Sequence, residues 1–515
     1  MIYSNPILKG FYPDPSVCRV GEDYYLVTSS FGYFPGVPIF HSKDLVNWKQ
    51  IGNCLNRESQ LPLFANHAFL KRHVGKTGIY APTIRYHHGK FYVVTTNMAH
   101  YRNYVVWAEQ PEGPWSEPLD LEWGGIDPSL LFDDDGKVYI SGTSAGPDEP
   151  EEGIYQAEIN LETGKLNSER RHIWKGSGGS YPEGPHLYKI GNVYYLLIAE
   201  GGTEYGHMVT VARSEQPYGP FESCPYNPIL THRNTNSPIQ ATGHAELIQA
   251  HDDTWWAIFL GIRPSGYPYY HQLGRETFLA PVKWTEDGWP IIGEQGRVHL
   301  EMEAPAFFQG NLENQIQLKR DDFDSETLSF EWNSIRSPIE GICSLKERSG
   351  WLALHGTEFG LDDIEDKAFI GRRQQDINCR VSTLMEFNPK EQGEEAGLTA
   401  FMNENSHYDI AVTSANGKQR VMFRRRIGSL WKTEREDEIE SDQIILSIRT
   451  NKTNYLFSYS LPGQEEIEIG RGECFYLSTE VAGGYTGVYL GMYAAGNGSS
   501  LQTPAYFDYF EYQIE

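Results

Sequence analysis

The alternation of apolar and polar residues along the first 305 positions predicts short β-strands joined by tight turns. The first example runs from Tyr12 to Thr28, where an acidic residue between two prolines precedes an apolar segment, a polar turn and an aromatic, β-branched run. This order is typical of a strand, a hairpin turn and a second strand. No segment of this part keeps a helical period long enough to form a helix that connects parallel strands.

The same pattern returns four more times along the chain. The copies recur about every 45–70 residues, which is a period typical of β-propeller blades. The five copies begin at Tyr12, Tyr80, Ile126, Tyr181 and Thr242. Further strand-like pieces follow the aromatic strands, including Val37–Phe40, Tyr104–Ala108 and His207–Ala212. The repeats therefore predict a five-bladed propeller with about four antiparallel strands in each blade.

Aligning the five copies puts one residue of each in an equivalent position, near the start of its first strand. These residues are Asp14, Ala81, Asp127, Glu183 and His244. The first strand of every propeller blade lines the central axis, so equivalent positions converge at one end of the channel. We therefore expect three carboxyl groups, far apart in sequence, to face one another across a small funnel.

The repeat stops near residue 305, and a second pattern follows. From about Leu318 to Tyr512, many short alternating strands with Gly-rich turns predict a β-sandwich. The chain is thus expected to be all-β, with a propeller over residues 1–305 and a concanavalin-like sandwich over residues 306–515. The segment from Arg424 to Glu440 mixes both charge signs, and we interpret it as a pair of solvated strand faces.

Length and charge narrow the class of ligand. A chain of 515 residues is too long for one compact core and indicates two or three domains. Its formal net charge of −26 argues against nucleic acid, anionic polymers and anionic membranes as partners. A neutral ligand that stacks on aromatic rings, such as a sugar, is compatible with this charge.

The N-terminus and the cysteines predict a cytoplasmic protein. Met1–Pro6 shows neither a basic segment nor an apolar core typical of a signal peptide, and no apolar run approaches the length of a membrane span. The cysteines have no CxxC or metal-site spacing, so we expect reduced thiols. They are Cys18, Cys54, Cys224, Cys343, Cys379 and Cys474.

Two carboxyl groups with opposed protonation states can hydrolyse a glycosidic bond, and a third can raise the pKa of the acid. Asp14, Asp127 and Glu183 would supply this set. The alternatives are that each Asp-Pro forms a turn, or that the three acids cap turns or bind a structural cation. His244 is either a buried core residue or a ligand of substrate or metal.

With these motifs in view, residues 1–305 resemble glycoside hydrolase family 43, the five-bladed propeller group of β-xylosidases and α-L-arabinofuranosidases. The C-terminal part resembles the β-sandwich of its β-xylosidase-like branch, including the closing stretch Pro504–Tyr512. The motifs of the propeller that carry the resemblance are Asn5–Leu8, Tyr12–Ser16, Phe40–Trp48, Gly125–Ser129, Tyr181–Pro185, Glu200–Thr203 and Gly243–His244.

The resemblance assigns roles to individual residues. It implies that Asp14 is the general base, that Glu183 is the general acid and that Asp127 tunes and orients this acid. It also implies that Arg275 reaches the sugar and the base, although an arginine is by composition more often at the surface. The remaining expected substrate contacts are Phe31, Tyr80, Thr203, His244 and Tyr485.

Two departures from the family pattern bear on the sugar. Tyr80 stands directly before Ala81-Pro82, where the family commonly has Trp, which predicts a differently shaped pocket floor. The loop Ser144–Glu152 lacks an aromatic residue that some β-xylosidases carry. In the family a sandwich loop can close one side of the pocket, and Gly483–Gly487 with Tyr485 at its tip is the candidate. Such a wall would favour attack at chain ends.

The resulting expectation is an inverting exo-glycosidase that removes terminal xylose, L-arabinofuranose or both from short oligosaccharides. The alternatives are an endo-arabinanase of the same fold and a propeller that binds sugar or protein without catalysis. The chemistry needs no cofactor. A structural calcium ion near His244, or in the sandwich at Asp322 and Asp508, is a hypothesis, and so is a homodimer or homotetramer.

Overall fold

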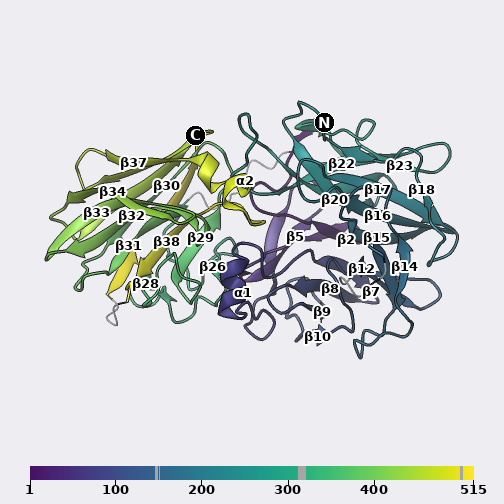
Figure 1. The fold of residues 1–515 in the computed structure, drawn as a ribbon, viewed down its shortest axis with the longest axis horizontal. Coiled ribbons are helices and arrows are strands. Elements are labelled where there is room, and N and C mark those ends of the chain that lie inside the picture. Colours follow the sequence, from purple (N-terminus) through teal and green to yellow (C-terminus); the bar gives the residue numbers. More distant parts are fainter. Residues whose placement is uncertain (145–148, 150, 311–319, 499–502) are drawn as a thin grey trace.

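The computed structural model describes residues 1–144, 149, 151–310, 320–498 and 503–515. Two β-rich bodies lie side by side (Figure 1), with the N-terminal one in purple to teal and the C-terminal one in green to yellow. The few helices in these ranges are short, namely α1 (His67–Arg72), the 3-10 helix η1 (Cys474–Leu477) and α2 (Thr479–Ala482). None of them is long and apolar enough to cross a lipid bilayer.

The N-terminal body contains five separate antiparallel sheets, each built from consecutive segments of the chain. The first blade consists of β2 (Ser16–Val20), β3 (Asp23–Val27), β5 (Gly36–Ser42) and β6 (Lys49–Leu55). The second consists of β7 (Thr83–His87), β8 (Lys90–Asn97), β9 (Arg102–Ala108) and β10 (Leu119–Asp120). The third consists of β11 (Ser129–Phe132), β12 (Val138–Thr143), β13 (Ile154–Glu158) and β14 (Arg171–Trp174).

The last two blades follow the same order. The fourth consists of β15 (Glu183–Ile190), β16 (Val193–Glu200), β17 (Met208–Ser214) and β18 (Glu222–Ser223), with β19 (Leu230–Thr231) also paired to β17. The fifth consists of β20 (Gln240–Gln249), β21 (Trp255–Ile262), β22 (Glu276–Trp284) and β23 (Pro290–Ile292). Four strands per blade agree with the spacing of the sequence repeats.

The innermost strands of the five blades form a closed ring. β2 contacts β7 and β20, β11 contacts β7 and β15, and β15 contacts β20. The inner strand of the last blade, β20, is buried along nearly its whole length because blades press on both of its faces. At the rim, β1 (Ile2–Ser4) pairs with β24 (Glu301–Glu303), which joins the two ends of this body. The propeller expected from the repeats is confirmed.

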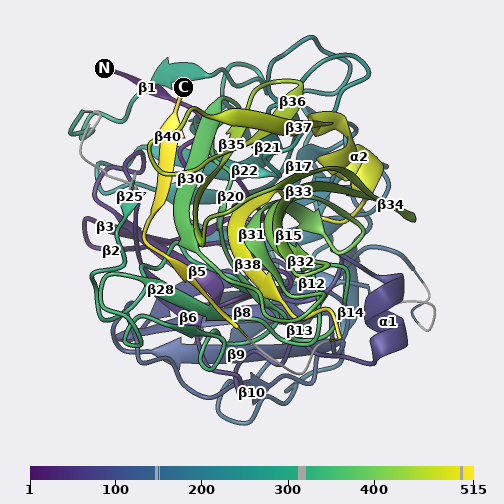
Figure 2. The same ribbon diagram turned by 90° about the vertical axis from the view of Figure 1, so that its left-hand side faces the viewer.

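The C-terminal body is a sandwich of two antiparallel sheets that face the viewer in Figure 2. One sheet contains β25 (Arg320–Asp321), β27 (Cys343–Ser344), β28 (Leu352–His355), β30 (Cys379–Glu386), β35 (Gln443–Thr450), β36 (Asn454–Ser460), β37 (Ile467–Glu473), β39 (Pro504–Phe507) and β40 (Phe510–Ile514). The other contains β29 (Ala368–Arg373), β31 (Glu395–Asn403), β32 (Ser406–Ala415), β33 (Lys418–Ile427), β34 (Leu430–Glu438) and β38 (Tyr489–Ala495).

The sandwich packs on the propeller through a mixed apolar and hydrogen-bonded contact. β4 (Tyr33–Phe34) of the propeller pairs with β26 (Ser334–Ile335) of the sandwich. The rings of Tyr33 and Tyr489 stack with centroids 3.8 Å apart, and the Arg373 Nε donates to the Phe11 carbonyl at 2.7 Å. Because backbone pairing and a buried guanidinium are both directional, the two domains are held in one orientation.

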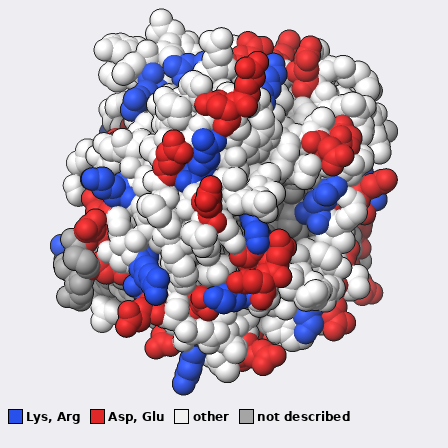
Figure 3. Space-filling model, turned by 90° about the vertical axis from the view of Figure 1, so that its right-hand side faces the viewer, with Lys and Arg blue, Asp and Glu red and all other residues white. Residues whose placement is uncertain are grey.

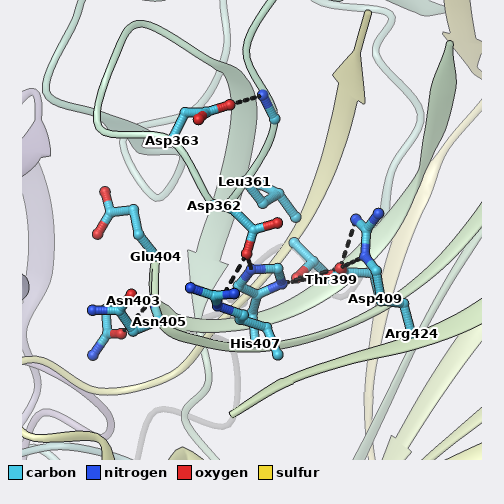
Figure 4. A network of polar contacts seen from close by, with 12 residues as sticks. Leu361, Asp362, Asp363, Thr399, Asn403, Glu404, Asn405, His407, Asp409 and Arg424 are labelled. Carbon is cyan, nitrogen blue, oxygen red and sulfur yellow. Dashed lines mark hydrogen bonds and ion pairs between the residues drawn. The ribbon is translucent and has the colours of Figure 1, made fainter. Parts of the chain in front are cut away.

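A buried polar network fixes a sandwich loop over the sheet that contains β32 and β33 (Figure 4). His407 lies between two carboxylates, with Nδ1 2.9 Å from Asp409 and Nε2 3.3 Å from Asp362. The Arg424 Nε donates to Asp409 at 2.9 Å, and the Thr399 hydroxyl donates to it at 2.8 Å. Arg424 is thus buried, whereas the facing strand β34 is mostly exposed. Our interpretation of this segment as two solvated faces therefore holds only for β34.

The face of the propeller turned away from the sandwich carries acidic side chains in scattered groups among uncharged residues (Figure 3). The basic side chains drawn there lie singly or in small groups between the acidic ones. Nucleic acid binding depends on a continuous basic surface, which this face does not offer among the residues drawn.

Candidate active site

The five equivalent residues of the blades meet around one cavity. Asp14, Ala81 and Asp127 each stand two positions before the inner strand of their blade, Glu183 begins β15, and His244 lies within β20. All five line a cavity of about 640 Å³. Residues separated by up to 230 positions in the sequence thus bring their side chains to the same cavity. The arrangement inferred from the alignment is the one observed.

The backbone at three of these positions adopts an uncommon conformation. The φ angles are 53° at Asp14, 54° at Asp127 and 46° at His244, in the left-handed region that residues with a Cβ rarely occupy. The register of β20 also shifts between Gly243 and Glu246, beside His244. Such local strain is retained where surrounding contacts hold it, and it is concentrated at functional sites.

Asp14 is held by two donors from different parts of the chain. The Arg275 guanidinium donates to Asp14 Oδ1 at 2.8 Å, and the Ser29 hydroxyl donates to Oδ2 at 2.5 Å. His244 Nδ1 lies 3.9 Å from the same Oδ1. Both carboxylate oxygens are therefore fixed in direction, with one charged and one neutral donor.

Asp127 and Glu183 are linked through the backbone. The amide of Gly184, the residue after Glu183, donates to Asp127 Oδ2 at 3.1 Å. Gly184 has a φ of 57°, and a Cβ there would lie 2.9 Å from the His244 ring. Only glycine lets the backbone approach both Asp127 and His244 at this point.

The two acids have strongly shifted pKa values. Burial raises the pKa of Glu183 to about 8, and the nearby charges of Asp127 and Asp14 add to this rise. Burial also raises the pKa of Asp127 to about 6, against the opposing effect of His244. Burial and the mutual repulsion of the two carboxyl groups therefore favour a pair that holds one proton at neutral pH, and the larger rise in pKa is that of Glu183. The cavity thus combines an arginine-paired carboxylate with a carboxylic acid that is protonated at neutral pH.

His207 is a neighbour of Glu183 that the sequence did not reveal. Its Nε2 lies 3.9 Å from Glu183 Oε1, and its Nδ1 is 3.1 Å from the Ala241 carbonyl. Burial lowers the pKa of His207 to about 3, so the ring is neutral. The proton on Nδ1 is required by the carbonyl, which leaves Nε2 as an acceptor that faces Glu183.

Arg275 connects the two domains at the cavity. Besides Asp14, its guanidinium donates to the Thr203 hydroxyl at 3.1 Å and to the Tyr485 carbonyl at 3.3 Å. Its side chain is only 9% exposed, in contrast to the surface position that its residue type favours. The planar guanidinium with five N–H donors can reach three partners in different directions, which a lysine cannot do.

An aromatic wall forms one side of the cavity. The ring centroid of Phe31 lies 5.2 Å from that of Tyr80 and 5.9 Å from that of Tyr485. The Arg275 guanidinium lies 5.5 Å from the Phe31 ring. Aromatic faces next to directed polar groups suit a sugar, which has both apolar C–H faces and hydroxyl groups.

The sandwich supplies part of the wall through the loop that was expected to close the pocket. Gly483, Gly484 and Tyr485 all line the cavity. The Tyr485 amide donates to the Gly75 carbonyl at 2.9 Å, which docks this loop on the propeller. Lys76, which also lines the cavity, has its Nζ 6.0 Å from the Tyr485 ring.

The two departures from the family pattern have different outcomes. Tyr80, the residue before Ala81-Pro82, lines the cavity, and its hydroxyl donates to the Lys76 carbonyl at 2.6 Å. This departure therefore lies in the cavity wall, where the Tyr80 ring centroid is 5.2 Å from that of Phe31. Most of the loop Ser144–Glu152 lies outside the described residues.

Several residues of the site were not expected from the sequence. Ser29 follows an ordinary β-strand, and Lys76 lies in a polar loop. Tyr181 lies within the motif Tyr181–Pro185 and Glu204 follows the motif Glu200–Thr203, so their proximity to Glu183 and Thr203 was the available signal. The cavity-lining residues that were not expected are Lys76, Ile126, Tyr181, Gly201, Gly202, Glu204 and Thr479.

No metal centre is evident in the described part of the chain, where no group of three or more His, Cys, Asp and Glu side chains is placed to hold an ion. Asp322 of the proposed calcium site instead pairs with Arg320 at 2.7 Å. The thiols of all six cysteines are free.

Comparison with known protein families matches both bodies of the chain. Residues 3–290 match the family described as glycosyl hydrolases family 43. Residues 320–513 match the β-xylosidase C-terminal concanavalin A-like domain. Together the two matches cover nearly the whole chain.

Similar proteins are of comparable length. A non-reducing end α-L-arabinofuranosidase of Bacteroides ovatus is 43% identical over 99% of this chain and 94% of its own. A xylosidase/arabinosidase of Butyrivibrio fibrisolvens is 40% identical over 100% of this chain and 99% of its own. The crystal structure of a xylan β-1,4-xylosidase from Bacillus halodurans superposes with a TM-score of 0.92 at 34% identity, with 99% of each chain covered.

Proposed function

The chain belongs to glycosyl hydrolase family 43, and we propose that its cavity removes single terminal pentoses, D-xylose or L-arabinofuranose, from short oligosaccharides with inversion at the anomeric carbon. The relatives that support this sugar class are described as an arabinofuranosidase, a xylosidase/arabinosidase and a xylosidase. They differ in the sugar, so both pentoses belong to the proposal.

The observation that carries the proposal is one cavity that holds an arginine-paired carboxyl group and a second carboxyl group with a raised pKa. Asp14 is paired with Arg275 at 2.8 Å, whereas the pKa of Glu183 is raised to about 8 by burial and nearby acids. Inverting hydrolysis needs this combination, because one group must accept a proton from water while the other donates one.

The reaction follows from these roles. Asp14 accepts a proton from a water molecule, whose oxygen forms a bond to the anomeric carbon. The glycosidic C–O bond breaks on the opposite face of the sugar, and Glu183 donates its proton to the leaving oxygen. The products are the free pentose with inverted configuration and a shortened glycan. The proton received by Asp14 returns to solvent, and Glu183 takes up a new one.

The remaining cavity residues position the sugar and tune the acid. Asp127 keeps the proton on Glu183 through its negative charge and orients the acid's backbone through Gly184. Arg275 and Thr203 offer donors to sugar hydroxyl groups, and His244 lines the cavity beside Asp14. Phe31, Tyr80 and Tyr485 form the face against which the sugar ring packs.

Exo attack is favoured by the shape of the site. An endo-arabinanase must hold a chain on both sides of the bond, which requires an open groove. Here the loop Gly483–Gly487 of the sandwich docks on Gly75 and closes one side. A cavity closed in this way accepts a chain end.

The proposal is tested by turnover of 4-nitrophenyl β-D-xyloside and 4-nitrophenyl α-L-arabinofuranoside measured side by side. Activity on at least one, with the inverted anomer as first product by NMR, supports it. Turnover of neither by a folded protein would favour the non-catalytic binding propeller. Loss of arabinan viscosity before free sugar appears would favour the endo alternative.

Three expectations beyond the chemistry are also proposals. The free cysteines support a cytoplasmic location, which fractionation of the native cells tests. The exposed edge strand β34, with Leu430 and Trp431 at its start, supports a homodimer or homotetramer, which analytical ultracentrifugation tests. Metal analysis after exhaustive dialysis tests the structural calcium ion.

A further inference from the structure

Tyr181 is an exposed aromatic residue at the mouth of the cavity. Its side chain lines the cavity, yet the residue is 65% exposed to solvent. A tyrosine that buries little of its ring on folding contributes little to the core. This ring is therefore free to contact a ligand at the mouth of the cavity.

The backbone holds this ring in place at a cost. The φ angle of Tyr181 is 55°, in the left-handed region that is unfavourable for a bulky residue. On one side the ring lies over Gly202, where a Cβ would be 3.3 Å from a ring carbon. Glycine at this position thus lets the rim loop approach the ring closely.

A buried carboxylate fixes the loop that leads to Tyr181. Glu200 accepts hydrogen bonds from the Ser177 amide at 2.9 Å, the Gly179 amide at 2.7 Å and the Thr210 hydroxyl at 2.5 Å. The amide of Gly201 also donates to the Ser180 carbonyl at 2.7 Å. These contacts hold residues 177–180 as a rigid support, so the exposed ring is preorganised.

The chemistry of the site defines what passes over this ring. Tyr181 stands two residues before Glu183, and both side chains line the same cavity. An acid must come within hydrogen-bond distance of the oxygen that it protonates, so the leaving group lies beside Glu183. The closed side of the cavity is formed by Phe31 and the sandwich loop, which leaves the mouth for the leaving group.

We propose that Tyr181 is the platform on which the sugar ring of the leaving group stacks, so that the preferred substrates carry a sugar on the scissile oxygen and not a small aglycone. This inference rests on the proposed function. A tyrosine suits the purpose because it offers a large, rigid, amphipathic face with few rotatable bonds. The C–H face of a sugar ring packs on the aromatic face, while its hydroxyl groups remain in water.

The test compares two substrates that share the xylosyl group and differ in the leaving group. The leaving group of β-1,4-xylobiose is a second xylose, whereas the leaving group of β-D-xylosyl fluoride is a fluoride ion, which has no ring to stack. Tyr181→Asn removes the ring and keeps a residue type that tolerates the left-handed backbone. We expect kcat/KM on xylobiose to fall about five- to tenfold and kcat/KM on the fluoride to stay at the level of the unaltered enzyme. Tyr181→Phe keeps the platform and should retain activity on both.

A matched control exists on the same domain. Tyr101 is 68% exposed, has a φ of 51° and packs on Phe69, but it does not line the cavity. Tyr101→Asn should leave kcat/KM on both substrates unchanged. Equal loss on both substrates in Tyr181→Asn, or no loss on xylobiose, would overturn the inference while the proposed function stands. Turnover of neither substrate by the unaltered enzyme would reject the xylosidase activity and this inference with it.

Discussion

Arg275 donates a hydrogen bond to Asp14 at 2.8 Å although 261 residues separate them in the chain. The pair forms only because β2 and β20 are neighbours in a closed ring, so that the loop before β22 reaches the start of the first blade. The guanidinium also contacts the sandwich at the Tyr485 carbonyl. The Arg275 side chain therefore links the last blade to the first, contacts the sandwich and orients the proposed base.

Arg275→Lys should lower kcat/KM about a hundredfold, because a lysine cannot reach Asp14, Thr203 and the Tyr485 carbonyl together and a misplaced base is costly. Steady-state kinetics with the better aryl glycoside measures this effect. Arg263→Lys is the matched control, since Arg263 makes a two-pronged ion pair with Glu276 at 2.6 and 2.8 Å outside the cavity. It should lower the melting temperature and leave the kinetics near wild type. Equal kinetic effects in both variants would contradict the role of Arg275.

Asp14→Asn should lower kcat about 10²- to 10⁴-fold, because an amide cannot accept a proton from water. The variant keeps the shape of the side chain, and thermal denaturation should show that it folds. The control is Asp134→Asn, a carboxylate whose side chain is 86% exposed on the third blade. A kcat within tenfold of wild type in Asp14→Asn would exclude Asp14 as the base.

The pH profile should identify Glu183 as the acid and Asp127 as its modulator. In the wild type, kcat/KM should fall as the pH rises through about 8, where Glu183 loses its proton. In Asp127→Asn this alkaline limb should move to lower pH by about one unit, because the negative charge that helps to raise the pKa of Glu183 is absent. An alkaline limb that stays in place would show that another group is responsible.

Glu183→Gln should stabilise the fold at alkaline pH while it abolishes most activity on substrates with poor leaving groups. Folding raises the pKa of Glu183 from 4.5 to about 8, so within this window the folded state holds a proton that the unfolded state has released. The stability of the wild type is therefore reduced progressively from pH 4.5 to 8, and glutamine avoids this loss.

We expect the free energy of unfolding of Glu183→Gln to exceed that of the wild type by on the order of 4–5 kcal/mol above pH 8. The difference should vanish near pH 4.5. Chemical denaturation at both pH values measures it. A variant that is less stable than the wild type at pH 8 would contradict the raised pKa.

The sequence was informative about the acids because equivalent positions of repeated blades meet at the same end of a propeller. Asp14, Asp127 and Glu183 could be aligned without any knowledge of contacts, and the five blades, the second domain and the family followed from the same motifs. The conformation of these positions was not visible. Neither the left-handed backbone at Asp14 nor the neutral His207 beside Glu183 leaves a mark in residue order.

The sequence by itself determined that five similar units form an all-β ring with three acids at one end, because alternation and turn residues act over a few positions and repeat. Only the tertiary structure decided which other groups reach those acids. The burial of Arg275, the docking of Tyr485 on Gly75 and the pKa of about 8 at Glu183 all depend on contacts between distant segments. Burial and charge proximity are properties of the packed chain, so no local pattern can encode them.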